Sequence, residues 1–244
     1  MILLRSLIYF VVLVLSIILF GLPIALLGWL MPYRMRSQVG NLWGRFNLHM
    51  LRIICGLKYE ITGMENIPEK SAIVLSKHQS AWETIALRGL LPPEQAWVLK
   101  RELMWIPVFG WALAAVQPIA IDRKAGRKAA KEIIEKGIER LKKGRLVVIF
   151  PEGTRVAPGD YKRYGIGGAL LASKSGYPVV PIAHNAGVYW RRRGIKKYPG
   201  TIQVVVGKPI DTEGMSTSKI NEMVEEWIEG QVAALPGVLP NTSA

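Results

Sequence analysis

Short runs rich in β-branched residues alternate with amphipathic segments from about residue 58 to the end of the chain. Two of these segments repeat apolar residues at helical spacing, and Ser216, Thr217 or Ser218 can cap the second. The expected helices are 129–141 and 219–235, and the expected strands are 59–62, 72–75, 96–99, 116–121, 146–150, 179–182 and 201–206. This alternation predicts an α/β fold: a single domain with a mainly parallel or mixed sheet flanked by helices.

The front of the chain follows another pattern. Residues 7–31 form a run of 25 residues without a charge. As a helix the run would extend about 37 Å, against roughly 30 Å of hydrocarbon in a bilayer. Gly21 and Pro23 interrupt it, so the run can either span the bilayer or bend back as a helical hairpin within one leaflet. We expect an N-terminal membrane-associated helical segment.

Arginines are distributed unevenly about this run. Arg5 precedes it, whereas Arg34, Arg36, Arg45 and Arg52 follow it, which predicts that the rest of the protein lies on the cytoplasmic side of the membrane. The chain then divides into three parts: a membrane-anchoring region at 1–57, the α/β domain at 58–235 and a tail at 236–244.

The net charge and the hydropathy of the chain indicate which classes of molecule it can bind. The net charge is +14 and the mean hydropathy is +0.22, a combination that suits a phospholipid surface, a phosphorylated substrate or an acidic carrier protein. The apolar N-terminus and the lack of aromatics within the basic runs argue against nucleic acid. The single cysteine, Cys55, lies in an apolar stretch and is expected to be a packed thiol. No metal-ligand spacing occurs in the sequence, so no metal is predicted.

Polar residues come directly after four of the expected strands. They are His78, Lys100, Glu152 and Asn185. In open α/β sheets the carboxyl ends of parallel strands share one edge, and ligands bind there. We therefore expect these four segments to converge on one cleft.

His78 has a carboxylate five positions later, Glu83, at a transition from strand to helix. If His78 precedes the helix and Glu83 lies in its first turns, the carboxylate can bind one ring nitrogen. The other nitrogen is then free to take a proton from an alcohol. Ser80 lies beside the histidine, but it lacks the Gly-x-Ser-x-Gly pattern of a serine nucleophile. His49 and His184 have no such partner and are expected to be surface or packing residues.

The segment Phe-Pro-Glu-Gly-Thr-Arg at residues 150–155 places a carboxylate, a flexible glycine, a hydroxyl and a guanidinium in one turn. The planar fork of Arg155 is suited to a phosphate group. This combination predicts a site for a phosphorylated substrate.

The segments 78–83, 100–110, 150–155 and 179–182 resemble, in order and spacing, the four motifs of the glycerophospholipid acyltransferase family. The resemblance is greatest to bacterial 1-acyl-sn-glycerol-3-phosphate (lysophosphatidate) acyltransferases. Two positions depart from the family pattern, which usually has asparagine where this chain has Lys77 and aspartate where it has Glu83.

The resemblance implies direct transfer of a fatty acyl group from an acyl carrier protein or coenzyme A thioester to the sn-2 hydroxyl of lysophosphatidate. No other cofactor is expected, and the protein would work at a bacterial inner membrane, among its phospholipids. By motif, His78 would be the base and Glu83 its orienting partner. Lys100 and Arg155 would bind phosphate. The full set of implied substrate-binding residues is Lys100, Glu152, Gly153, Thr154, Arg155, Val180 and Pro181, with the glycerol at Glu152 and Gly153 and the acyl donor at Val180 and Pro181.

Two alternatives remain open. The acceptor can be another lyso-lipid or glycerol 3-phosphate. A noncatalytic module that binds anionic lipid would keep Arg155, but it would have no use for His78 paired with Glu83.

Overall fold

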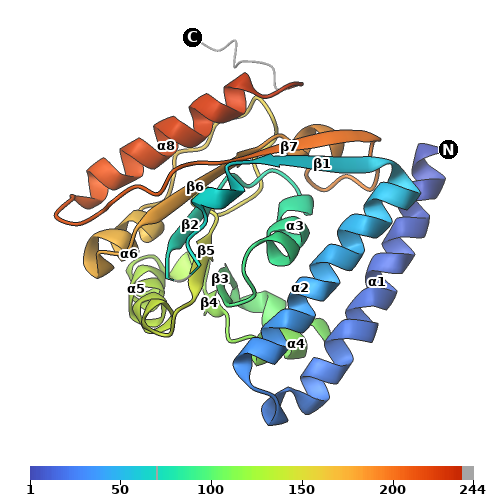
Figure 1. The fold of residues 1–244 in the computed structure, drawn as a ribbon, viewed down its shortest axis with the longest axis horizontal. Helices are drawn as coiled ribbons and strands as arrows, with labels where there is room; N and C mark the ends of the chain where they lie inside the picture. The colour runs from blue at the N-terminus through green and yellow to red at the C-terminus, as the bar shows by residue number, and fades with distance from the viewer. Residues whose placement is uncertain (70, 238–244) are drawn as a thin grey trace.

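The computed structural model describes residues 1–69 and 71–237, and they form a mixed seven-stranded sheet between two layers of helices (Figure 1). The strands are β1 Leu57–Thr62, β2 Ile73–Ser76, β3 Gln95–Lys100, β4 Ile119–Ile121, β5 Leu146–Ile149, β6 Val179–His184 and β7 Gly200–Val206. The helices are α1 Ile2–Leu27, α2 Tyr33–Met50, α3 Trp82–Leu90, α4 Phe109–Ala115, α5 Arg127–Lys142, α6 Gly167–Ser175, α7 Ala186–Tyr189 and α8 Thr217–Ala234. The predicted α/β fold is confirmed, while most of the expected tail at 236–244 falls outside the described residues.

The strand order is β1-β7-β6-β2-β5-β3-β4. Every neighbouring pair is parallel except β6 with β7, which run antiparallel. The strands β2 to β6 therefore point the same way, and their carboxyl ends lie at one edge of the sheet. This is the edge at which the sequence places most of its candidate chemistry.

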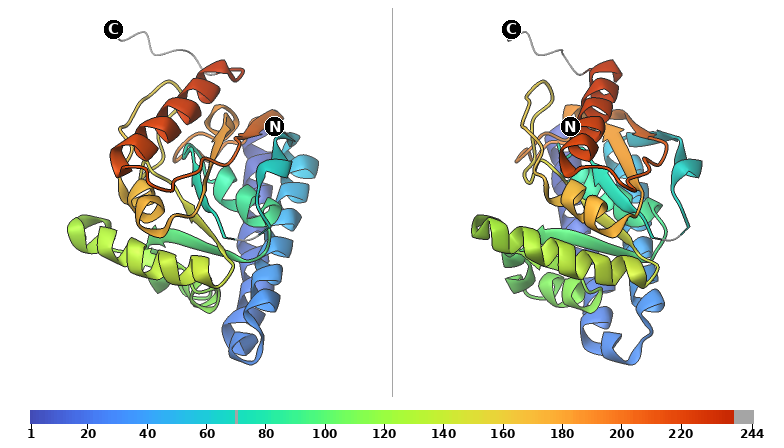
Figure 2. Two further views of the ribbon diagram at one scale, coloured as in Figure 1. Left: turned by 60° about the vertical axis from the view of Figure 1, so that its left-hand side comes forward. Right: turned by 90° about the vertical axis from the view of Figure 1, so that its left-hand side faces the viewer.

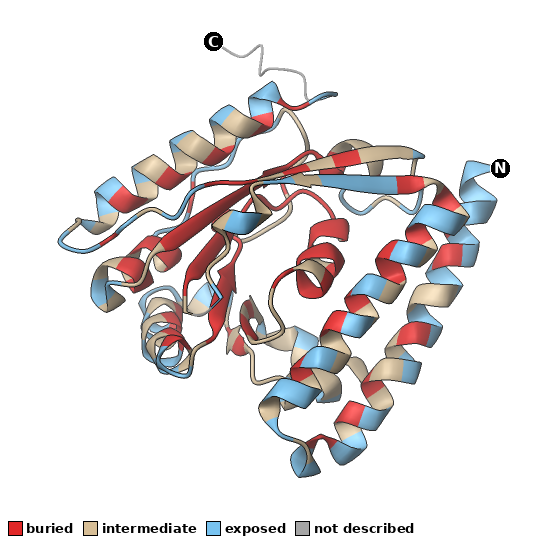
Figure 3. Cartoon of the chain, in the orientation of Figure 1, coloured by how far each residue is buried: buried red, intermediate tan, exposed pale blue. Residues whose placement is uncertain are grey.

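Each face of the sheet buries its own core, because alternate residues of a strand point to opposite sides. Val74 of β2 packs with Trp82 and Ile85 of α3, on the face that α2 also covers. Its neighbour Ile73 packs on the other face, which α5, α6 and α8 cover. Figure 2 turns the layer of α5, α6 and α8 toward the viewer, and Figure 3 shows the central strands and α3 as the most deeply buried elements.

The N-terminal helices α1 and α2 lie side by side as an antiparallel hairpin (Figure 1). The helix α1 continues through Gly21 and Pro23, and the chain reverses only at residues 28–32. The helical segment Ile2–Leu30 is long and apolar enough to cross a membrane, and most of its large apolar side chains are exposed. The chain therefore does not fold back at Gly21 and Pro23, where the sequence suggested a hairpin, but only after residue 27.

The close contact of α2 with α3 depends on two glycines. A Cβ atom at Gly44 would come within 2.5 Å of the backbone nitrogen of Gly89. The backbones of α2 and α3 approach each other directly at this point, which fixes α3 against the hairpin.

The boundaries of the expected strands differ from the structure by one or two residues, and the start of β4 differs by three. Val116 was assigned to a strand, but it ends α4, and β4 begins only at Ile119. The amide of Val116 donates to the carbonyl oxygen of Leu113, so Val116 caps the helix, and Gln117 then leaves it with a φ of 51°. A β-branched residue at the end of a helix looks like the start of a strand when only the local sequence is considered.

Candidate active site

His78 follows β2, and Glu83 lies in the first turn of α3, as the sequence predicted. The Nδ1 atom of His78 is 2.8 Å from Oε1 of Glu83. The same oxygen accepts hydrogen bonds from the amides of Gln79 and Ser80, at 2.8 and 2.7 Å. Three contacts on one buried carboxylate oxygen fix the plane of the imidazole and favour a proton on Nδ1, which leaves Nε2 available as a base.

The environment of Glu83 keeps it ionised. Its side chain is fully buried, and burial by itself opposes ionisation. The hydrogen bonds from His78 and from the amide of Ser80 outweigh burial, so the pKa of Glu83 lies below its ordinary value. A carboxylate that is negative at neutral pH can stabilise the imidazolium that forms when His78 takes a proton.

His184 has the packing role that the sequence predicted for it. It is fully buried beneath the active histidine, where Nδ1 accepts from the amide of Ala186 and Nε2 lies 2.9 Å from the carbonyl oxygen of Lys77. Both nitrogens are used, so the ring is neutral with its proton on Nε2. Burial lowers the pKa of His184, in agreement with this assignment. The other histidine, His49, is exposed on α2.

The turn at residues 150–155 packs directly onto the His78 segment. The rings of Phe150 and His78 stack with their centroids 4.1 Å apart, and the amide of Val156 donates to the carbonyl oxygen of His78 at 2.8 Å. Gly153 has a φ of 66°, a left-handed conformation in which glycine is favoured. The backbone reversal at Gly153 is what brings Arg155 back toward the histidine.

A cavity of about 430 Å³ begins at His78 and extends between the N-terminal helices and α4. Its polar lining residues include Lys100, Arg123 and Arg155 as well as His78. Its apolar part is formed by side chains of α1, α2, α4 and neighbouring segments: Ile17, Phe20, Ile24, Val39, Trp43, Leu103, Phe109, Leu113 and Val116. The cavity wall therefore combines cations that can bind a phosphate with apolar side chains that can contact a hydrocarbon chain.

Two arginines that line the cavity were not among the predicted site residues. Arg123 follows β4, and its guanidinium donates to the carbonyl oxygen of Gly153. Burial lowers its pKa. The expected strand 116–121 ends two residues before Arg123, so the rule of strand ends could have identified this arginine. Arg88 projects from α3, and burial lowers its pKa to about 10. Nothing in the sequence indicated that Arg88 would line the cavity.

Other expected site residues lie away from the cavity. The carboxylate of Glu152 is buried, accepts from the amide of His78 at 2.6 Å and is 2.8 Å from Nζ of Lys77. Burial raises the pKa of Glu152 to about 7, although Lys77 and the His78 amide favour its charge. Val180 is a core residue, and Asn185 binds the backbone of Gln203 and Pro236.

The remaining predicted residues have mixed positions. Pro181 borders a separate groove beside β7 and α8. Gly153 and Thr154 are partly exposed in the turn next to the cavity. Within residues 1–69 and 71–237, no group of three or more His, Cys, Asp or Glu side chains is placed to hold a metal ion.

Comparison with known proteins agrees with this geometry. Residues 58–185 match the acyltransferase family. The chain is 43% identical to a Pseudomonas aeruginosa 1-acyl-sn-glycerol-3-phosphate acyltransferase, over 98% of this chain and 94% of that one. It is 30% identical to an enzyme of the same name from Limnanthes alba, over 93% and 80%. The crystal structure of a 1-acyl-sn-glycerophosphate acyltransferase, PlsC, from Thermotoga maritima superposes with a TM-score of 0.80 at 26% identity, over 97% of this chain and 96% of that one. The chain belongs to the acyltransferase family.

Proposed function

We propose that this enzyme transfers a fatty acyl group from a thioester to the sn-2 hydroxyl of 1-acyl-sn-glycerol-3-phosphate, giving phosphatidate. The observation that carries the proposal is the cavity itself. His78, which is paired with Glu83, lines a cavity whose wall also contains several cations and many apolar side chains. The names of the relatives support the same acceptor.

The chemistry needs only one transfer step. Nε2 of His78 takes the proton of the acceptor hydroxyl as its oxygen attacks the thioester carbonyl. The carbon–sulfur bond breaks, the thiol leaves with the proton returned by His78, and the new ester remains on the lipid. A thioester is already activated, so a covalent acyl-enzyme is unnecessary. The cations near His78 would hold the phosphate and orient the hydroxyl for attack.

Direct transfer predicts that Ser80→Ala and Cys55→Ala keep substantial activity. The hydroxyl of Ser80 is buried and accepts from the amide of Trp82, and Cys55 packs near the carbonyl oxygen of Arg5. Neither side chain lines the cavity. The measurement is kcat for each variant, together with mass spectrometry of the intact enzyme incubated with donor alone. An acyl group trapped on either residue would contradict direct transfer.

Arg155→Ala should raise KM for the acceptor. The guanidinium lines the cavity, and no carboxylate of the described residues lies within 4 Å of it. Its loss should remove roughly 1.5–3 kcal/mol of charge-assisted binding, or about ten- to a hundredfold in KM. Arg163→Ala is the matched control, because Arg163 is exposed on the same loop and does not line the cavity. Equal KM values for the two variants would remove Arg155 from the phosphate site.

The decisive experiment is an acyl-transfer assay of the purified protein in detergent. Lysophosphatidate, other lysophospholipids and glycerol 3-phosphate serve as acceptors, and acyl carrier protein and coenzyme A thioesters serve as donors. Preferred transfer to lysophosphatidate supports the proposal. Preference for another acceptor would reassign the substrate, and transfer to none would favour a lipid-binding module.

We also propose that the enzyme acts at the cytoplasmic face of a bacterial inner membrane. The exposed apolar face of α1 and the arginines that follow it support this location. Both the acceptor and the product are lipids, so attachment places the cavity where its substrate is found.

A further inference from the structure

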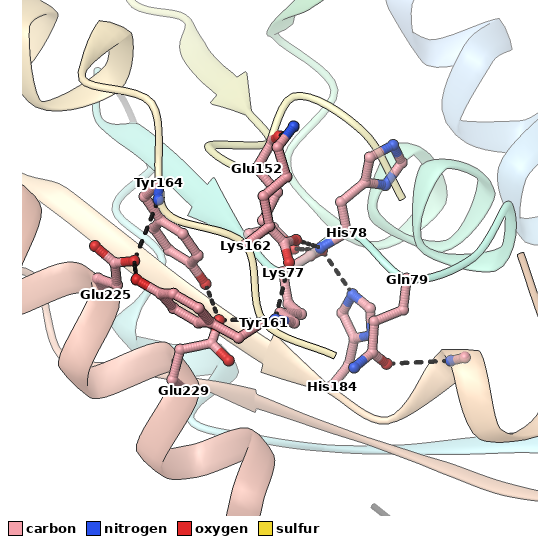
Figure 4. A network of polar contacts seen from close by, with 12 residues as sticks. Lys77, His78, Gln79, Glu152, Tyr161, Lys162, Tyr164, His184, Glu225 and Glu229 are labelled. Atoms are coloured by element: carbon pink, nitrogen blue, oxygen red, sulfur yellow. Dashed lines mark hydrogen bonds and ion pairs between the residues drawn. The ribbon is translucent and has the colours of Figure 1, made fainter. Parts of the chain in front are cut away.

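Lys77 is a buried cation that lies between two carboxylates. Its Nζ atom is 2.8 Å from Oε1 of Glu152 and 2.7 Å from Oε1 of Glu229, and its side chain is only 1% exposed. A buried charge is tolerated only when it is paired. Glu152 comes from the turn after β5 and Glu229 from α8, so Lys77 joins the active-site strand to the last helix of the chain (Figure 4).

The network continues from Lys77 to the active histidine. The second oxygen of Glu152 accepts from the backbone amide of His78 at 2.6 Å. Glu229, Lys77, Glu152 and the His78 amide therefore form one continuous chain of contacts. Glu83 holds the imidazole from one side, and this chain holds the backbone beneath it from the other.

Two glutamates on the same face of α8 make different contacts. Glu229 binds Lys77 and also accepts from the hydroxyl of Tyr164 at 2.7 Å. Glu225, one helical turn earlier, accepts from the hydroxyl of Tyr161 and from the amide of Tyr164, at 2.6 and 3.2 Å. Both glutamates anchor the loop that follows the 150–155 turn (Figure 4). Only Glu229 reaches the network under His78.

We propose that Glu229 and Lys77 are positioning residues of the transferase. Through Glu152 they fix the backbone of His78, so that its imidazole stays within reach of the substrate hydroxyl. The inference rests on the proposed function. Acid–base catalysis requires the base within hydrogen-bond reach of the reacting hydroxyl. Small displacements of the base are costly, so a tether that prevents them acts on kcat more than on KM.

The test compares Glu229→Gln with Glu225→Gln. Each substitution removes one negative charge from the same face of α8, and each affects one anchor of the loop. Glu229→Gln should lower kcat by about ten- to a hundredfold with little change in KM, because a displaced base slows only the chemical step. Glu225→Gln should leave kcat near that of the unmodified enzyme. Equal losses in the two variants would mean that the glutamates only anchor the loop, and would overturn the proposal.

A double-mutant cycle separates the tether from general stability. Lys77→Met leaves two facing carboxylates without their cation, so it should lower kcat more than Glu229→Gln does. In the Lys77→Met background, adding Glu229→Gln should cause no further loss, because the two residues act as one unit. Losses that multiply across the cycle would contradict a shared tether.

Hydrogen exchange gives a readout that does not depend on activity. Backbone amides in a peptide covering residues 76–84 should exchange faster in Glu229→Gln than in Glu225→Gln. If the unmodified protein transfers no acyl group to any acceptor, the proposed function fails, while the exchange measurement still tests the tether. If transfer is normal and exchange is the same in both variants, the tether alone is refuted.

Discussion

Glu83→Gln should lower kcat by roughly two to four orders of magnitude, by comparison with the serine-protease triad, where the equivalent amide replacement costs about 10⁴-fold. The substitution keeps the size of the side chain but removes the charge that stabilises the imidazolium. The amides of Gln79 and Ser80 point at Oε1, so they should hold the oxygen of the glutamine toward His78. The protease loss includes a wrong histidine tautomer, which these two amides should prevent here, so the loss should fall toward the lower end of this range and measure the missing charge.

Three further variants show whether the loss comes from the charge of Glu83 and whether Glu83 acts through His78. Glu83→Asp keeps the charge but shortens the side chain, so the 2.8 Å contact to His78 should lengthen and the loss should be smaller than for glutamine. His78→Ala should be at least as damaging as Glu83→Gln. The double variant should be scarcely worse than His78→Ala, since the pair acts as one unit. The measurement is kcat, with thermal melts to show that each variant is folded. Near-normal turnover in Glu83→Gln would show that another group orients His78.

Replacing Leu15 and Leu19, on the outer face of α1, with lysine should release most of the protein from membranes. Leu15 and Leu19 are 58% and 66% exposed and do not line the cavity. A lysine placed in the hydrocarbon region costs about 2.5–3.5 kcal/mol, so Leu15→Lys with Leu19→Lys should reduce membrane partition by several orders of magnitude. Deleting residues 1–31 is a weaker test, because Ile17, Phe20 and Ile24 form part of the cavity wall.

The measurement is the distribution of the protein between membrane and supernatant in low and high salt. Ser218→Lys with Ala233→Lys is the matched control, because it adds the same charge at exposed positions of α8. High salt removes attachment that depends only on basic residues. If the α1 variant stays bound in high salt as firmly as the control, the main anchor lies elsewhere. Activity of the α1 variant in detergent shows that the site is intact.

The strands were predictable because the sheet core is built from β-branched runs. Residues 146–149 and 179–182 are buried on both faces of the sheet, so their sequence is apolar without interruption. The pairing of His78 with Glu83 was predictable for a local reason: five positions across a strand-to-helix transition fix both residues within one short segment.

Contacts between distant segments could not be predicted in the same way. Nothing near Lys77 in the sequence indicates that its partner is Glu229, which lies 152 positions away on another helix. The same limit applies to Glu152, whose carboxylate turns toward the backbone of His78 and not toward the cavity. A sequence motif shows which residues gather in a turn, but the direction of each side chain depends on the packing of the whole domain.

The order of the sheet has a consequence for how the protein is made. β1 lies at an edge of the sheet, and its only neighbour there is β7, so a strand completed by residue 62 pairs with one that ends at residue 206. On the ribosome, α1 emerges first and can engage lipid while β1 still has no partner. The contact of Lys77 with α8 forms later still. If α1 anchors the chain as proposed, a chain that ends before β7 would be attached to the membrane while its sheet is incomplete and its active site is inert.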